Sequence, residues 1–210
     1  MSSSVAAATR PPSTRAAGMP RSAIREIMTM AATRPSVIHM EIGEPDFSTP
    51  PAIVDGAFEA VRQGWTKYSS NAGLPSLRKL VAERCSSRWN ASVTADQIVI
   101  TTGAIGALYS SLMAVVDAGD EVLIPDPGWP NYEAITHLAG AKPVRFNQPA
   151  SRGFLPDPDE IERLITPRTK AILINTPGNP SGAVFGTALM KRIGEIARRS
   201  GIYVLSDEIY

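Results

Sequence analysis

The segment 171–210 constrains the fold more than any other part of this sequence. An aliphatic run at residues 171–174 leads into the polar stretch N-T-P-G-N-P-S-G at 175–182, and a helical pattern at 186–199 precedes a second apolar run at 202–205. A strand, a turn, a helix and a strand form a βαβ unit, whose parallel strands place their carboxyl ends at one edge of the sheet. Ligands bind at that edge in open α/β sheets, so we expect Asn179 and Asp207 to face one crevice.

The hydrophobic pattern upstream predicts more of the same architecture. Apolar runs of strand length separate segments with helical spacing, and helices are expected near 20–31, 51–63, 75–90, 103–116, 126–138 and 157–165. Five strands are expected for the sheet, near residues 98–102, 121–124, 142–146, 170–175 and 202–206, and a further short strand is expected at 37–42. The fold class predicted from this order is α/β, with a mostly parallel sheet flanked by helices.

Composition excludes several functional classes. The 210 residues carry 21 Lys and Arg against 20 Asp and Glu, so a net charge of +1 gives no reason to expect a nucleic-acid or membrane-surface partner. The apolar runs have strand length, which excludes a transmembrane segment. The single Cys85 rules out an internal disulfide framework, and His39 and His137 lack ligand spacing, so no metal site is predicted.

A glycine turn at Gly103 offers a place for an anion. It lies between the apolar run that ends at residue 102 and a long apolar helical segment, so backbone N–H groups and the helix dipole both favour a phosphate there. Neither the GK[ST] of a P-loop nor a G-x-G-x-x-G fingerprint accompanies it, which disfavours a nucleotide.

Four motifs together carry a family resemblance. They are N-T-P-G-N-P-S-G at 175–182, S-D-E-I-Y at 206–210, G-E-P-D-F at 43–47 and K-Y-x-x-x-x-G-x-x-x-L-R at 67–78. In this order they resemble the fold-type I pyridoxal-phosphate aminotransferases of class I/II, the group that includes aspartate aminotransferase. The resemblance runs from about residue 18 to residue 210 and covers the first half or so of such an enzyme.

The resemblance implies pyridoxal 5′-phosphate as the cofactor, with a role for each matching residue. Asp207 would pair with the pyridine nitrogen, which a carboxylate keeps protonated, and Asn179 and Tyr210 would donate hydrogen bonds to the ring 3-oxygen. Trp129 would stack on the pyridine face. The phosphate would be held by positions that correspond here to Gly103, Ala104 and Ile105.

Two residues nearer the N-terminus complete the implied site. Gly43 would bring the backbone close to the substrate carboxylate, and Tyr68 would reach the phosphate of the cofactor bound by the partner subunit, which implies a homodimer. By the same resemblance the 126–127 and 179–180 peptide bonds are expected to be cis.

The family's Schiff-base lysine and its substrate-carboxylate arginine would lie beyond Tyr210. None of the lysines present, Lys67, Lys79, Lys142, Lys170 and Lys191, has the family's serine–lysine context. The chain is therefore expected to be an N-terminal fragment without its own catalytic lysine and inactive alone. The full-length protein is expected to be a cytoplasmic enzyme that moves an amino group between an amino acid and a 2-oxo acid.

The expected domain organisation has three parts. Residues 1–18 are rich in Ser, Ala, Pro and Arg without an acidic residue, which predicts a disordered tail; transit peptides share this composition, but no amphipathic arginine-rich helix is present. Residues 19–47 are expected to form the N-terminal arm and the start of a small domain. Residues 48–210 are expected to form the cofactor-binding large domain, truncated at its C-terminus.

Three alternatives stay open from the sequence. A pyridoxal-phosphate C–S lyase, decarboxylase or acyl-transferring synthase of the same fold would share the Asn, Asp and Tyr positions. A non-catalytic aminotransferase-like domain of a transcription regulator would follow an N-terminal DNA-binding domain. The N-terminal tail of this chain shows no helix-turn-helix pattern. The third alternative is an α/β module that binds another phosphate ligand. It would be distinguished from the first two by its failure to bind pyridoxal phosphate.

Overall fold

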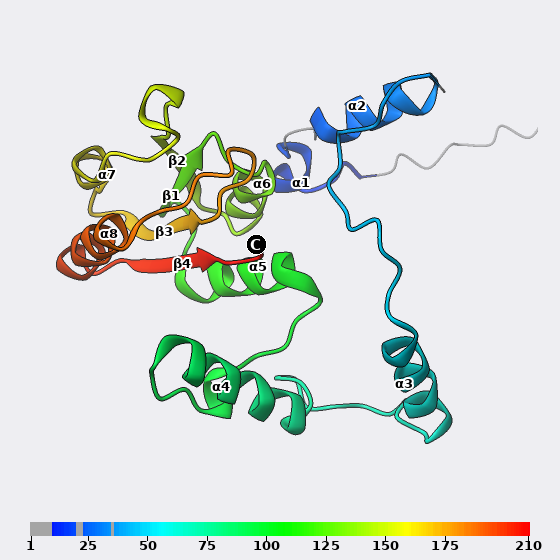
Figure 1. The fold of residues 1–210 in the computed structure, drawn as a ribbon. Helices are drawn as coiled ribbons and strands as arrows, with labels where there is room; N and C mark the ends of the chain where they lie inside the picture. The colour runs from blue at the N-terminus through cyan, green and yellow to red at the C-terminus, as the bar shows by residue number, and fades with distance from the viewer. Residues whose placement is uncertain (1–9, 20–22, 35) are drawn as a thin grey trace, which may run out of the picture. The chain divides into compact units, whose positions relative to one another are not determined.

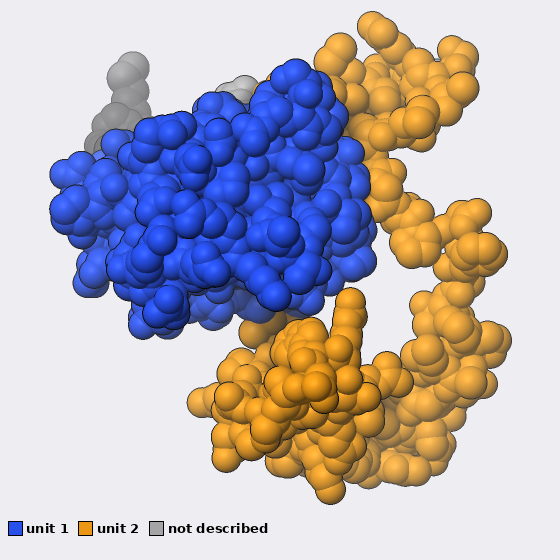
Figure 2. Space-filling view, turned by 60° about the vertical axis from the view of Figure 1, so that its left-hand side comes forward, with its two compact units in different colours: residues 1–20, 102–210 blue, residues 21–101 orange. Residues whose placement is uncertain are grey.

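The computed structural model describes residues 10–19, 23–34 and 36–210. It divides into two compact units, one formed by residues 1–20 and 102–210 and the other by residues 21–101, which Figure 2 colours separately. No helix in the described part of the chain is long and apolar enough to cross a membrane.

The first unit is built on a four-stranded parallel sheet with the order β2-β1-β3-β4 (Figure 1). The strands are β1 (Glu121–Asp126), β2 (Lys142–Asn147), β3 (Thr169–Asn175) and β4 (Tyr203–Asp207). Strands β1 and β3 are central and almost wholly buried, as expected for a parallel sheet covered on both faces. Because β2 lies on one side of β1 and β3 on the other, the chain order reverses between β1 and β3.

Helices cover both faces of this sheet, which confirms the predicted α/β class. On one face Val122, Ile124 and Leu173 share a core with α5 (Gly103–Val115) and α6 (Asn131–Leu138). On the other face Leu123 and Ile172 share a second core with α7 (Pro158–Leu164) and α8 (Thr187–Ser200). Successive strand residues thus point to opposite faces, which is the period-2 pattern that the sequence displays.

The remaining elements of this unit are short. They are α1 (Thr14–Ala17) and the 3₁₀ turn η2 (Ala150–Arg152). Helix α1 falls within the segment expected to be a disordered tail, and its first turn is capped by Ser13, whose Oγ accepts from the Ala16 N–H at 3.2 Å. Residues 1–9 of that segment lie outside the described residues. Helix α6 begins at Asn131, later than the predicted start at 126, because the proline-rich segment 127–130 forms a turn first.

The described residues of the second unit form four helical elements. They are α2 (Ala23–Ala32), α3 (Pro51–Arg62), α4 (Pro75–Trp89) and the 3₁₀ turn η1 (Ala95–Gln97). The three α-helices agree with the predicted helices, although the predicted helix start at residues 20–22 lies outside the described residues, and η1 was not predicted.

Two predicted strands in the second unit were wrong. The segment 37–42 alternates in sequence, but Ile38 and Met40 are exposed and no strand of the described residues pairs with it. The segment 98–102 directly follows η1 and is not a strand. Its Ile100 N–H donates at 2.9 Å to the carbonyl of Ala72, which lies in a turn and not in a strand. An apolar run becomes a strand only where a neighbouring strand is available, so the described sheet has four strands instead of five.

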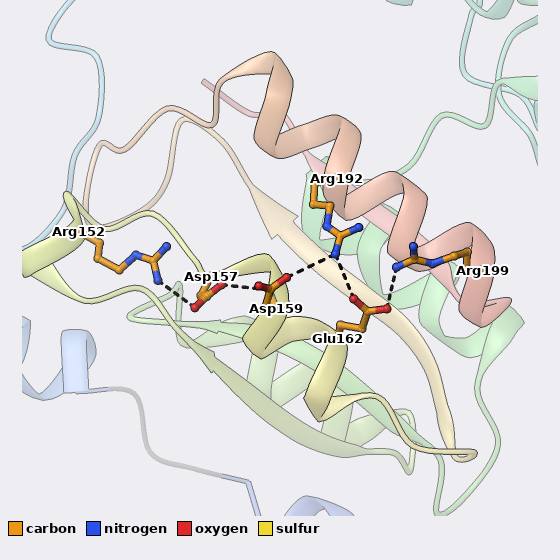
Figure 3. A network of polar contacts seen from close by, with 6 residues as sticks. All are labelled: Arg152, Asp157, Asp159, Glu162, Arg192 and Arg199. Atoms are coloured by element: carbon orange, nitrogen blue, oxygen red, sulfur yellow. Dashed lines mark hydrogen bonds and ion pairs between the residues drawn. The ribbon is translucent and has the colours of Figure 1, made fainter.

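Charged side chains join α7 to α8 on the outside of the sheet (Figure 3). Arg192 of α8 lies 3.4 Å from Asp159 and 3.3 Å from Glu162, both on α7, and Arg199 lies 2.7 Å from Glu162. A separate pair joins Arg152 to Asp157 at 3.0 Å. These side chains are at least one-third exposed, so each pair contributes at most about 1 kcal/mol and the packing of α7 and α8 rests on the core beneath.

Glu121, at the amino end of β1, is a buried carboxylate with three partners. Its side chain is 3% exposed, accepts from the Thr166 hydroxyl at 2.6 Å and from Arg168 at 3.2 Å, and lies 3.5 Å from the Lys142 ammonium. The hydrogen bond from Thr166, followed by the charges of Arg168 and Lys142, lowers the pKa of Glu121 below its ordinary value in spite of burial. The carboxylate therefore ties together the starts of β1 and β2 and the turn before β3.

Replacing Glu121 with glutamine is expected to cost about 1–3 kcal/mol of unfolding free energy at pH 7. Because the pKa of the folded-state carboxyl is lowered, its stabilisation is present above the ordinary pKa of 4.5 and is lost as the pH falls below that value. Urea unfolding of both proteins at pH 7 and pH 3.5 should show the difference shrinking in acid. Glu133→Gln, at the more exposed pair with Arg145, serves as control and should change stability by less than about 1 kcal/mol. An equal deficit at both pH values would contradict this role.

Candidate functional site

The candidate site lies at the carboxyl edge of the sheet, where β1, β3 and β4 end. Asn175 and Asp207 are paired in register as the last residues of β3 and β4, so the loops that follow both strands leave the same edge. Strand β1 ends there too and continues into the turn that carries Trp129. The reversal of strand order between β1 and β3 makes this the place where an open α/β sheet has a crevice.

Asp207 is held from two directions. It is 7% exposed, accepts from the Tyr132 hydroxyl at 2.7 Å through Oδ2 and from the Ile209 N–H at 3.3 Å through Oδ1. Tyr132 lies on α6 and is 1% exposed, so its phenol is buried against the carboxylate. Burial, and then the hydrogen bond to Asp207, raise the pKa of Tyr132 far above its ordinary value, which keeps the hydroxyl protonated as a donor.

Trp129 is half-buried beside this pair. Its ring contacts the Tyr132 ring edge-on, with centroids 5.5 Å apart and planes at 82°, and it packs against the core formed by α5 and α6. The Trp129 ring is therefore packed on one side, and the residue remains partly exposed. The turn before it contains the cis bond Asp126–Pro127, and the loop after β3 contains Thr176–Pro177 and Asn179–Pro180, also cis, so the two cis bonds expected from the sequence are present with a third.

Asn179 and Tyr210 form the next pair along the edge. The Asn179 side-chain amide donates to the Tyr210 hydroxyl at 3.3 Å. The Asn179 backbone N–H donates to Oδ1 of Asn175 at 2.7 Å, and Nδ2 of Asn175 donates to the carbonyl of Asp207 at 3.0 Å. The structure thus connects Asn179, Tyr210 and Asp207 through short contacts.

Gly103, Ala104 and Ile105 form the first turn of α5, as predicted from the sequence. Gly103 has φ of 70°, a left-handed conformation that favours glycine, and the N-cap Thr102 makes no side-chain capping bond. The first-turn N–H groups of a helix have no intrahelical acceptor, and the dipole adds positive potential. The binding of an anion at this turn remains a prediction.

Gly43 and Tyr68 lie in the second unit. Gly43 is exposed in an irregular segment, and the Tyr68 side chain is fully exposed. Their contact with substrate or cofactor remains a prediction. Among the residues that the structure describes, no group of three or more His, Cys, Asp or Glu side chains could hold a metal ion.

Sequence reasoning did not assign a role to two residues of this site, Tyr132 and Asn175. Asn175 is the first residue of the motif N-T-P-G-N-P-S-G, and Tyr132 follows Trp129 by three positions. A useful signal is a hydrogen-bonding residue at the end of a buried strand, because its side chain has to find a partner there.

The raised pKa of Tyr132 predicts a loss of stability in alkali. Unfolded tyrosine ionises near pH 10, whereas folded Tyr132 keeps its proton, so the stabilisation is full below pH 10 and declines as the pH rises through and above it. The decline approaches about 1.4 kcal/mol per pH unit for one group. Urea unfolding between pH 9 and 11 should give a steeper slope for the unaltered protein than for Tyr132→Phe. Tyr109→Phe, at a partly exposed tyrosine of α5, is the control and should keep the steep slope; identical slopes in all three would refute the prediction.

Comparisons with known proteins agree with these features. A family model described as aminotransferase class I and II matches residues 35–210. An aspartate aminotransferase from Pyrococcus horikoshii is 42% identical over 190 residues, which are 90% of this chain and 49% of that protein. The chain spans about half the length of the curated relatives it matches.

Solved structures give the same result. An aspartate aminotransferase from Thermus thermophilus with maleate superposes with a TM-score of 0.90 at 36% identity and covers 96% of this chain and 54% of its own. An alanine aminotransferase from Pyrococcus furiosus gives a TM-score of 0.89 at 34% identity, with 95% and 52% covered.

Proposed function

Because the chain belongs to the class I and II aminotransferase family, we propose that the complete protein transfers an amino group between an amino acid and a 2-oxo acid. The expected cofactor of this family is pyridoxal phosphate. The observation that carries the proposal is the buried Asp207 carboxylate, held by the Tyr132 hydroxyl at 2.7 Å, next to the Asn179–Tyr210 pair.

The donor set fits such a cofactor. Pyridoxal phosphate, when bound, delocalises the electron pair that forms on the carbon beside the amino group. Asp207 is a buried carboxylate and can hold a proton at the ring nitrogen, while the Asn179 amide and the Tyr210 phenol can donate to the ring 3-oxygen. Trp129 offers an aromatic face, and the start of α5 offers the positive end of a helix dipole to a phosphate.

We also propose that the complete protein is a cytoplasmic homodimer in which Tyr68 serves the partner's site and Gly43 lies beside the substrate carboxylate. The exposure of the Tyr68 phenol supports the first role, because this group is available to a second subunit. The position of Gly43 in an exposed segment supports the second, since its backbone can approach a ligand closely.

The test uses the complete protein. After incubation with pyridoxal phosphate and desalting, we expect it to retain the cofactor, seen as visible absorbance, and to transfer the amino group of L-aspartate or L-alanine to 2-oxoglutarate. Both donors are included because the matching structures include an aspartate and an alanine aminotransferase. Protein that retains no cofactor and transfers no amino group from a panel of amino acids would disprove the function.

Shared sites make a second measurement possible. Tyr68→Ala and Asp207→Asn subunits should each form inactive dimers, but mixing them creates hybrids in which one site has both native residues. Random exchange of equal amounts should restore about a quarter of the unaltered activity. If light scattering shows a monomer, or if mixing restores nothing, the shared-site arrangement is rejected.

A further inference from the structure

Asn175 makes two hydrogen bonds that join separate parts of the site. It is 4% exposed and ends β3. Its Nδ2 donates at 3.0 Å to the carbonyl of Asp207 at the end of β4, and its Oδ1 accepts at 2.7 Å from the N–H of Asn179 in the loop after β3. One buried amide therefore connects the backbones of the two residues expected to meet the cofactor ring.

The orientation of this amide is fixed by its partners. A backbone carbonyl can only accept a hydrogen bond and a backbone N–H can only donate one. Turning the Asn175 amide over would therefore place its oxygen against the carbonyl of Asp207 and its NH₂ group against the N–H of Asn179. Burial makes such unpaired groups costly. The side chain consequently has one orientation, and through it Asp207 and Asn179 have a fixed separation.

The neighbouring residue provides a natural comparison. The hydroxyl of Thr176 accepts from the Phe185 N–H at 2.8 Å and so holds the far end of the same loop. Both side chains stabilise the loop, but only Asn175 contacts the residues that would hold the ring. A change that acts merely by loosening the loop should therefore be seen at either position.

We propose that Asn175 is a positioning residue that sets the placement of Asn179 relative to Asp207. The proposal rests on the proposed function for the identity of the ligand: the nitrogen and the 3-oxygen of one rigid pyridine ring have a fixed spacing, so their protein partners need placement within about 0.5 Å. The two hydrogen bonds of the Asn175 side-chain amide provide this placement.

The test compares the unaltered protein with Asn175→Ala, Asn175→Asp and Thr176→Val. Hydrogen exchange of the Asn179 and Phe185 amides, followed by NMR, reports on the two ends of the loop without any ligand. Binding of pyridoxine 5′-phosphate reports on the ring partners, because this analogue has the phosphate, the 3-oxygen and the ring nitrogen but no aldehyde. Its ultraviolet spectrum follows protonation of the ring.

We expect Asn175→Ala to speed exchange at Asn179 about tenfold or more and to weaken analogue binding about tenfold, with exchange at Phe185 unchanged. Thr176→Val should do the reverse: faster exchange at Phe185, and Asn179 exchange and binding within about twofold of the unaltered protein. Asn175→Asp keeps an oxygen that accepts from Asn179 but has no N–H for the carbonyl of Asp207, so in this variant, once folded, protection at Asn179 should be retained while analogue binding weakens.

Unchanged exchange at Asn179 in Asn175→Ala, or equal effects of the alanine and valine variants on binding, would overturn the proposal. If Asn175→Ala does not fold, loss of Asn179 protection in Asn175→Asp would overturn it instead. Failure of the unaltered protein to bind the analogue would count against the proposed cofactor site, while the exchange measurements would still decide whether Asn175 positions Asn179.

Discussion

Replacing Asp207 with asparagine is expected to slow amino transfer by the complete protein about a hundred- to a thousandfold. This is the size of effect seen when one preorganised electrostatic partner is removed from a reacting group. Asparagine has the shape of aspartate and keeps an oxygen for the Tyr132 hydroxyl, but it has no negative charge to hold a proton on the ring nitrogen. The buried surroundings strengthen the effect, because a charge interaction is screened less there than in water.

Initial rates at saturating substrate, with cofactor content and thermal unfolding measured on the same samples, separate this effect from misfolding. Glu208→Gln is a matched control, because it removes one carboxylate from the adjacent, exposed position. Within the described part of the chain, the Glu208 carboxylate accepts a hydrogen bond only from the Ser206 hydroxyl. We expect that variant to keep its rate within about twofold. A normal rate in Asp207→Asn, or the same loss in Glu208→Gln, would remove Asp207 from its proposed role.

The βαβ unit at 171–210 was predictable because each of its signals is local. The aliphatic run of β3, the helical spacing of α8 and the run of β4 can each be recognised within one element. Parallel strands then place Asn175 and Asp207 at one edge without further information. The family resemblance, which rested in part on the motifs at the ends of these strands, is confirmed by the matches to known aminotransferases.

The wrong strand predictions have one physical cause. A run such as Ile98–Val99–Ile100 has the composition of a buried strand, but a strand also needs a neighbour with free backbone groups. In the described residues this run has none, and Val99 is 62% exposed. The sequence pattern indicates that the segment prefers the strand conformation, whereas only the structure shows whether a neighbouring strand is there to pair with it.

Tyr132 and Asn175 escaped prediction for a related reason. Tyr132 contacts a carboxylate 75 residues away along the chain, and Asn175 contacts a carbonyl 32 residues away. Neither partner can be deduced from the periodicity around the residue itself. The family resemblance identifies the residues that would contact the cofactor, whereas Tyr132 and Asn175 contact those residues and hold them in place.

Replacing Gly128 with alanine is expected to destabilise the first unit by about 2–3 kcal/mol. A Cβ at this position would lie 2.5 Å from the carbonyl oxygen of Pro125 and 2.9 Å from Cγ of the same residue. Neither atom belongs to a flexible side chain, so the backbone between β1 and α6 would have to shift. That backbone carries Trp129, and the shift should also weaken binding of pyridoxine 5′-phosphate if the Trp129 ring contacts it.

Gly194→Ala provides the opposite expectation in the same unit. Gly194 lies inside α8, and a Cβ there would meet nothing within 4 Å, so alanine should stabilise the protein by about 0.5–1 kcal/mol through its better helix propensity. Urea unfolding should therefore move the two midpoints in opposite directions, although both variants add one methyl group. Shifts of the same sign would mean that the crowding at Gly128 does not determine its substitution cost. A destabilised Gly128→Ala with unaltered analogue affinity would show instead that the turn tolerates movement without displacing Trp129 from a ligand, and would separate the stability of this turn from its role in the site.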